Sequence, residues 1–246
     1  MSKPVISCAL RKRYLPVLLL LLLPVLACKA SAPAAATASS SPATIDEIRI
    51  NYPTGIETVH FEDGVTVVVD HKGPYAMGFP EQWEVGAFHE DFVPTVAKHC
   101  ETHGAICAMF QALYEKDSSV RIFAIDTSPD HLTKDSIAIL HIGMFQDERP
   151  LQLTIDELAA EYAAYINSTG QLQVTDFLEG TSNHGIPFAI VLNESVSSMD
   201  RSVYNAAALA KTDKVYLEVL YATNDETIDR VNEILPMLST LTANIE

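Results

Sequence analysis

The spacing of apolar residues along the chain predicts a mixture of strands and helices. Runs rich in β-branched residues predict strands, and apolar residues three or four positions apart predict helices. The predicted strands are residues 48–52, 65–70, 119–126 and 136–142, followed by four in succession at 172–179, 186–193, 203–211 and 215–223. Because parallel strands need long crossovers, the short connections among the last four predict an antiparallel meander.

Three helices are predicted before that meander. Two lie between residues 92 and 113, where Gly104 separates two apolar stripes of helical spacing. The third begins at Thr154, which with Glu157 has the spacing of a capping box. In such a box each residue's side chain binds the other's backbone N–H. This pattern is the strongest helix start in the chain.

A fourth helix is predicted at the C-terminal end, with an apolar stripe from Ile228 to Leu241. Asn224 is its expected N-cap, Asp225 and Glu226 would lie in its first turn, and Pro236 should kink it or end its regular part. The whole order of elements predicts an α+β fold, in which an antiparallel sheet carries helices on both faces as an α/β/α sandwich.

The N-terminal segment has the form of a targeting signal. Residues 1–13 carry the cations, and an apolar run of about 13 residues follows, which is short of the roughly 20 that span a bilayer. The run ends in Val25-Leu26-Ala27-Cys28, which resembles the lipobox of bacterial lipoprotein signal peptides. That resemblance implies cleavage before Cys28 and a diacylglycerol on its thiol. The alternative is an ordinary secretory signal with a cysteine near its cleavage site.

These boundaries predict three parts. Residues 1–27 are the signal peptide, and residues 28–44 form a tether rich in Ala, Ser and Pro with no periodic apolar positions. Residues 45–246 form one folded domain, which is long enough to bury a substantial core. The expected location is the extracytoplasmic face of a bacterial membrane, to which the lipid on Cys28 anchors the protein.

Composition narrows the classes of partner. Apolar residues make up 48% of the chain, which is enough for a packed core, and the net charge is −16. Because the signal segment holds four of the cations and no carboxylate, the remainder carries a charge of −20. Such a surface repels phosphate backbones, so nucleic acid is excluded as a partner.

Several segments together resemble a known family. They are the run Gly78-Phe79-Pro80-Glu81-Gln82-Trp83, the helical pair after Glu90, the strand at 121–126, and the ending at 215–222 with its amphipathic helix. The pattern is similar to the PsbP and Mog group, especially its bacterial secreted lipoproteins. The resemblance implies an α/β/α sandwich and an accessory or binding role, and it implies no catalytic residues.

The densest chemical cluster in the sequence spans His99 to Cys107. Cys100 and Cys107 would lie about 10 Å apart on one helix, too far for a disulfide, but they can meet if Gly104 breaks the helix. We therefore expect a Cys100–Cys107 disulfide, with two free thiols as the alternative. A metal site on His99 and His103 is the least favoured interpretation, and the histidines are expected to face solvent.

No cofactor, metal or catalytic residue is predicted. The acidic rows at Asp225, Asp229 and Glu233 and near Asp156 are expected to be solvated helix faces. Asp130 and His131 are expected to lie in a turn without chemistry, and no nucleophile motif is present.

The sequence therefore predicts a non-catalytic binding or accessory module, held at a membrane through Cys28, whose partner is another protein or an assembly. The alternative is a carrier or sensor of a small apolar ligand in a pocket between sheet and helices. An enzyme with an unfamiliar site is the third interpretation.

Overall fold

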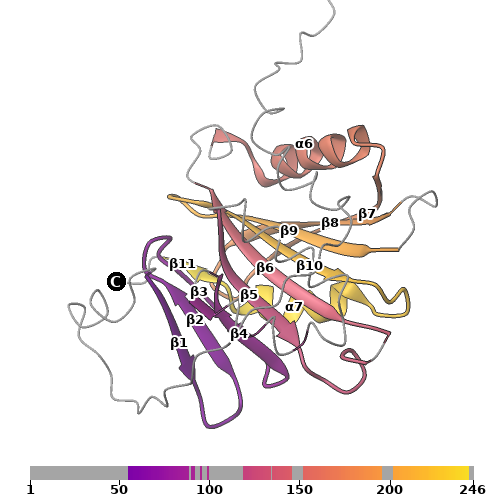
Figure 1. Ribbon diagram of the computed structural model, residues 1–246. Coiled ribbons are helices and arrows are strands. Elements are labelled where there is room, and N and C mark those ends of the chain that lie inside the picture. The colour runs from indigo at the N-terminus through magenta and orange to yellow at the C-terminus, as the bar shows by residue number, and fades with distance from the viewer. Residues whose placement is uncertain are drawn as a thin grey trace, which may run out of the picture.

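The computed structural model describes residues 55–88, 90, 91, 95, 99, 119–133, 135–145, 152–195 and 202–243. Within these ranges the chain forms two antiparallel sheets with helices α6 (Ile155–Ser168) and α7 (Arg230–Thr240), as Figure 1 shows. The predicted α+β class with antiparallel strands is therefore confirmed. The strand predicted at 48–52 and most of residues 92–113 lie outside the described ranges.

The larger sheet has seven strands in the spatial order β4-β5-β6-β10-β9-β8-β7, and every neighbouring pair is antiparallel. The strands are β4 (Trp83–Ala87), β5 (Val120–Asp126), β6 (Ala138–Phe145), β7 (Leu172–Thr181), β8 (Pro187–Ser195), β9 (Tyr204–Lys211) and β10 (Tyr216–Thr223). Strands β7 to β10 pair in sequence order. The predicted meander is thus confirmed, with bounds shifted by at most two residues.

A second, smaller sheet has the order β1-β2-β3-β11. Its strands are β1 (Ile56–His60), β2 (Thr66–Asp70), β3 (Tyr75–Phe79) and β11 (Thr242–Ala243). Only β2 was predicted from the sequence. A turn that includes Gly64, whose φ of +86° favours glycine, joins β1 to β2.

Gly78 and Phe79 are the last two residues of β3. The backbone N–H of Gly78 donates to Thr240 Oγ1 at 2.8 Å, so the end of α7 lies directly against this strand. A Cβ at position 78 would lie 3.3 Å from Thr240 Oγ1. The glycine therefore serves close packing here, which its sequence context did not indicate.

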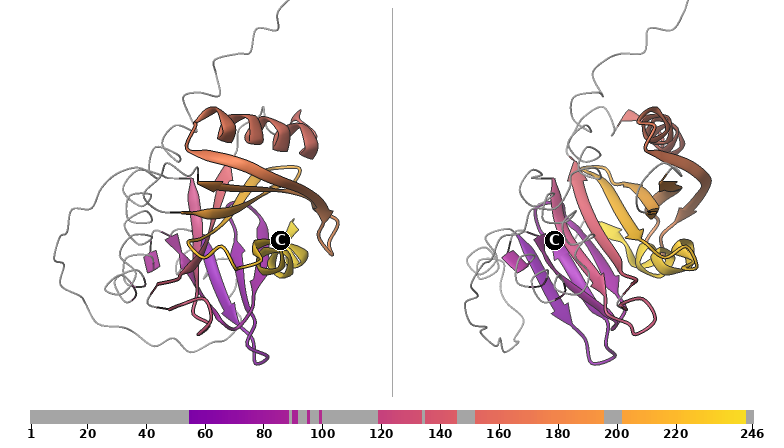
Figure 2. Two further views of the ribbon diagram at one scale, coloured as in Figure 1. Left: turned by 90° about the vertical axis from the view of Figure 1, so that its right-hand side faces the viewer. Right: turned by 45° about the vertical axis from the view of Figure 1, so that its right-hand side comes forward.

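Helices α6 and α7 pack on the larger sheet through alternate residues. Ala207 and Leu209 of β9 belong to the apolar cluster of α6, whereas Ala206 and Ala208 belong to the cluster of α7. Because successive side chains on a strand point to opposite faces, the two helices contact different faces of β9. Figure 2 shows them on the two sides of these strands.

The face that α7 contacts is shared with the smaller sheet. Val68, Met77 and Phe79 of that sheet lie in one buried cluster with Leu140 of the larger sheet and Leu238 of α7. The predicted sandwich had one sheet with helices on both faces, whereas in the structure strands of a second sheet also cover this face.

Helix α6 begins as its sequence predicts. The backbone N–H of Glu157 donates to Thr154 Oγ1 at 3.3 Å, and the backbone N–H of Thr154 donates to Glu157 Oε2 at 2.9 Å. The capping box is complete, and its hydrogen bonds lower the pKa of Glu157.

Helix α7 begins later than predicted, because Asp229 and not Asn224 is its N-cap. Asp229 Oδ1 accepts from the backbone N–H groups of Val231 and Asn232. The side chain of Asn224 accepts instead from Ile137 N. Pro236 does not end the helix, which continues to Thr240.

A buried ion pair joins the two sheets. Arg121 of β5 donates from Nε to Asp70 Oδ2 at 2.8 Å and from a terminal guanidinium nitrogen to Asp70 Oδ1 at 3.0 Å. The Asp70 side chain is fully buried at the end of β2. Burial alone would lower the pKa of Arg121, but its hydrogen bonds with Asp70 raise that pKa above its ordinary value.

No helix among the described residues is long and apolar enough to span a membrane.

Candidate functional site

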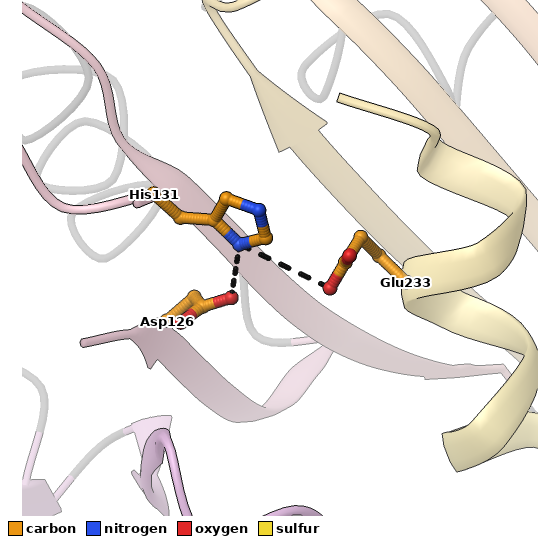
Figure 3. Close-up of side chains that lie close together, drawn as sticks. All are labelled: Asp126, His131 and Glu233. Carbon is orange, nitrogen blue, oxygen red and sulfur yellow. Dashed lines mark hydrogen bonds and ion pairs between the residues drawn. The ribbon is translucent and has the colours of Figure 1, made fainter. Parts of the chain in front are cut away.

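Three titratable side chains from separate segments meet beyond the end of β5. Asp126 is the last residue of β5, His131 lies in the following loop, and Glu233 lies in the first turn of α7 (Figure 3). His131 Nδ1 is hydrogen-bonded to Asp126 Oδ2 at 2.6 Å and lies 3.9 Å from Glu233 Oε2. One ligand atom of each residue lies within 4.8 Å of the other two.

A tight turn brings His131 back over Asp126. The backbone N–H groups of His131 and Leu132 both donate to the carbonyl of Ser128, and the backbone N–H of Ser128 donates to Asp126 Oδ1 at 2.8 Å. Asp126 is fully buried, so both of its oxygens receive partners inside the protein, as a buried carboxylate requires. The loop thereby fixes the Asp126 carboxylate and leaves Oδ2 facing the imidazole.

Glu233 reaches the same place from the start of α7. Its backbone N–H donates to the carbonyl of Asp229, the N-cap. The positive end of the helix dipole favours a carboxylate at this position. The Glu233 side chain is 25% exposed and that of His131 is 19% exposed, so solvent reaches the cluster on this side.

Negative charge predominates around His131. Burial alone would lower the pKa of His131, but its hydrogen bond with Asp126 and the charges of Asp126, Glu233 and Asp130 raise it. Burial raises the pKa of Glu233, and the charge of Asp126 raises it further against the opposing effect of His131. The carboxyls therefore repel each other, and one imidazole balances them only in part.

Arg230, the first residue of α7, makes its hydrogen bonds away from the cluster. Arg230 donates to the backbone carbonyls of Asn193 and Asn205 at 2.9 and 3.0 Å, and its guanidinium lies 5.7 Å from the centre of the Tyr204 ring. Its hydrogen bonds thus go to the far strands β8 and β9. Arg230 makes no hydrogen bond with the Asp126–His131–Glu233 cluster in the described part of the chain.

Tyr221 of β10 has a buried hydroxyl, and the residue lies on the same face of the larger sheet as Asp126. The residue is fully buried, and its hydroxyl has no hydrogen-bond partner in the described ranges. The ring contacts Trp83 edge-on at 6.1 Å, and Trp83 is paired with Asp126 across β4 and β5. Burial raises the pKa of Tyr221, and the charges of Glu233 and then Asp126 raise it further.

This arrangement offers one imidazole nitrogen and two carboxylate oxygens at a partly open surface. Such groups can hold a proton between them, as His131 and Asp126 do, or serve as ligands of a divalent cation. None of the three residues was selected from the sequence as a ligand. Asp126 was the end of a predicted strand, His131 was assigned to an inert turn, and Glu233 was assigned to a solvated row.

The structure changes the interpretation of that acidic row. Asp225, Asp229 and Glu233 do not share a helix face, because only Glu233 lies within α7. Asp229 caps the helix, and Asp225 accepts from Thr227 in the turn before it. The one sequence signal available was an aspartate at a strand end followed five residues later by a histidine.

Most site residues singled out in the sequence lie outside the described ranges. They are the lipidation candidate Cys28, the disulfide candidates Cys100 and Cys107, and His103. His99 is described, and the expectation that it faces solvent is wrong. It is buried, with its Nε2 3.1 Å from Glu84 Oε2 on β4.

No family model matches the sequence, and no curated protein matches it. Among solved structures, the chain is similar to cyanobacterial PsbP from Synechocystis, at 11% identity over 75% of this chain and 95% of that one, with a TM-score of 0.44. It is also similar to the Ran-binding protein Mog1p of Saccharomyces cerevisiae, at 9% identity over 76% and 96% of the chains, with a TM-score of 0.43.

A third similar structure is LpqN of Mycobacterium tuberculosis, a protein involved in cell envelope biogenesis. It shares 12% identity over 82% of this chain and 98% of that one, with a TM-score of 0.40. The solved structures thus include the PsbP and Mog group that the sequence resembles. At these identities the likeness concerns the arrangement of elements alone.

Proposed function

We propose that the chain is a lipid-anchored protein of the extracytoplasmic face of a bacterial membrane, and that its folded part is a non-catalytic binding or accessory module for a protein partner. The observation that carries the proposal is the run Val25-Leu26-Ala27-Cys28 at the end of a short apolar segment that follows a cluster of cations. That combination is typical of a lipoprotein signal peptide.

The organisation of the rest of the chain supports the same proposal. A tether at residues 28–44 would separate the lipid from a domain at 45–246, and the first described strand, β1, begins at Ile56, after the proposed tether. Two or more acyl chains on Cys28 would hold the protein at the membrane without a basic patch. A strongly acidic domain is therefore compatible with a membrane location.

The exposed edge of the larger sheet supports contact with a protein. Within the described ranges, β7 pairs with a strand on one side only, and an extended segment of a partner can pair with such an edge. Two backbone N–H groups of β7, those of Val174 and Phe177, donate to the side chains of Asn167 and Asp176, so a partner would bind the remaining backbone groups. Phe177 of this strand is 38% exposed, and Phe61 at the end of β1 is the other large apolar side chain that the described residues expose. Exposed aromatic side chains are common anchors of protein interfaces.

Anchoring is tested by expressing the protein in bacteria grown with a labelled fatty acid. Wild-type protein should carry the label and, after cleavage, a diacylglycerol mass on residue 28. Cys28→Ser should lose both. Cys8→Ser is the matched control, since it removes a cysteine from the cationic part of the signal segment. A wild-type chain without label and with an unmodified N-terminus would refute the anchor.

The binding role is tested by crosslinking in intact cells, followed by mass spectrometry of the captured proteins. The wild-type protein should capture one partner protein at a fixed ratio. The Phe177→Glu variant of β7 should lose this crosslinked partner, and the Phe61→Glu variant should retain it. Equal capture by both variants and the wild type would argue against the β7 edge as the contact.

A further inference from the structure

The Asp126–His131–Glu233 cluster brings three potential ligand atoms and two carboxylates together, and the buried, unpartnered hydroxyl of Tyr221 belongs to the same face of the larger sheet as Asp126. From this combination we propose that Asp126, His131 and Glu233 bind one divalent transition-metal cation of the Zn²⁺ class, with the Tyr221 hydroxyl facing the same cation. The proposal does not depend on the lipid anchor or on a protein partner.

The three ligand atoms are already close to the required geometry. Ligands of tetrahedral Zn²⁺ lie about 2.0–2.1 Å from the metal, which places them about 3.3 Å from one another. His131 Nδ1 lies 2.6 Å from Asp126 Oδ2 and 3.9 Å from Glu233 Oε2. These two distances bracket the expected value, and the oxygens of Asp126 and Glu233 lie within 4.8 Å of each other. Side-chain adjustments of about 1–1.5 Å would therefore bring all three atoms to one cation.

The supports of the ligands favour such a site. Asp126 is oriented by the backbone N–H of Ser128, which binds Oδ1 and leaves Oδ2 directed at His131. Ligating carboxylates in metal sites are held by hydrogen bonds of this kind. Glu233 lies on a regular helix, and its partial exposure gives a cation a way in from solvent.

The charge balance favours a cation. The cluster holds two carboxylates and a single imidazole, whose Nδ1 lies 2.6 Å from Asp126 Oδ2 and 3.9 Å from Glu233 Oε2. Arg230 directs its hydrogen bonds to β8 and β9. A divalent ion would relieve the repulsion between the two ligating carboxylates, which no arginine or lysine side chain among the described residues does.

The buried hydroxyl of Tyr221 is a second and independent observation. A buried hydroxyl without a partner is energetically unfavourable, so a ligand, a water or an ion is a common explanation for such a group. By strand pairing, Tyr221 lies on the same face of the larger sheet as Asp126, because Tyr221 and Ala124 are both paired with Leu140 and Asp126 is two residues beyond Ala124. A bound cation and its water would supply the missing acceptor and donor.

The donor set selects the class of metal. One imidazole nitrogen with carboxylate oxygens and no sulfur suits Zn²⁺, Co²⁺ or Mn²⁺. Ca²⁺ takes six to eight oxygen ligands and is disfavoured by a nitrogen donor. Zn²⁺ has the highest affinity of the three for such a site, and Co²⁺ reports the same geometry through its visible absorption.

The test uses the full-length protein purified in detergent, without a polyhistidine tag and after treatment with a chelator. Titration calorimetry with ZnCl₂ and absorption spectra with CoCl₂ should show binding of one ion per chain. His131→Gln and Glu233→Gln should each weaken Zn²⁺ binding by at least about 100-fold, the upper end of the loss caused by outer-shell changes. His71→Gln is the matched control, since His71 forms an exposed ion pair with Glu57 on the smaller sheet.

Tyr221→Phe separates metal binding from folding. Because the hydroxyl has no partner among the described residues, its removal should leave the melting temperature of the metal-free protein unchanged or slightly higher. It should also reduce the rise in melting temperature that Zn²⁺ causes. Glu233→Gln complements it, because Glu233 makes only a long ion pair and its loss should not unfold the protein.

Two results would overturn the proposal. One is the absence of binding at millimolar Zn²⁺. The other is binding that His131→Gln, Glu233→Gln and Tyr221→Phe leave equal to the wild type, which would place the metal elsewhere, for example on His99 and His103.

Discussion

Replacement of Arg121 tests how the two sheets are held together. Arg121→Met removes the guanidinium that binds both oxygens of Asp70 and keeps a side chain of similar length. Asp70 has no solvent exposure and the Arg121 side chain is only 10% exposed, so water cannot replace the lost partner. In this variant the buried, negatively charged carboxylate of Asp70 therefore lacks its positively charged partner.

The expected loss of stability follows from these contacts. Removal of one partner of a buried pair costs about 3–5 kcal/mol. Asp70 Oδ1 keeps the backbone N–H groups of Lys72 and Gly73, which donate to it at 2.9 and 3.2 Å, so we expect a value near 3 kcal/mol. In a domain of this size, that loss lowers the melting temperature by about 6–12 °C.

The assay is urea unfolding followed by circular dichroism, with a double-mutant cycle. Asp70→Asn and Arg121→Met should each destabilise, and the double variant should cost at least about 1 kcal/mol less than the sum, since each residue is the other's partner. Glu57→Gln is the control, because it breaks an exposed ion pair with His71 and should cost less than about 1 kcal/mol.

Two outcomes would refute this account of the interface between the sheets. A loss below about 1 kcal/mol for Arg121→Met would mean that the pair behaves as a surface ion pair. Additive single and double variants would mean that the two charges do not interact.

Two further predictions follow from buried tyrosines and from the cysteine pair. Burial raises the pKa of Tyr75, Tyr162 and Tyr221. Above pH 10 the unfolded chain therefore loses tyrosine protons that the folded chain keeps. The contribution of these residues to the free energy of unfolding should be complete below pH 10 and should fall as the pH rises above it. Thermal unfolding measured from pH 8 to 12 checks this, and a flat profile would contradict it. Alkylation of denatured protein purified without reductant should leave Cys100 and Cys107 unmodified, and two alkylated thiols there would exclude the disulfide.

Local signals in the sequence determined several elements of this fold. The four strands from β7 to β10 follow from apolar runs joined by short turns, and neighbouring strands with short connections can only pair antiparallel. The start of α6 follows from Thr154 and Glu157, whose side chains bind each other's backbone within one turn. In both cases the interacting groups lie close together in the sequence, so the pattern contains the physical cause.

Only the tertiary structure decided the features that depend on distant contacts. Gly78 packs against the end of α7 because Thr240, 162 positions away, accepts a hydrogen bond from its backbone N–H. Asn224 does not cap α7 because Ile137 uses its side chain. Arg121, which binds Asp70, lies at a bulge where the register between β5 and β6 shifts. The sequence gives no local signal for that bulge.

The candidate site belongs to the same class of features. Asp126 and His131 meet through a turn held by Ser128, and Glu233 joins them from more than 100 positions further along the chain. Each residue alone reads as an ordinary polar group at a strand end, in a loop or on a helix. Their shared chemistry arises because the larger sheet places the end of β5 beside the first turn of α7, and the energy of that packing is spread over an apolar core that no single segment encodes.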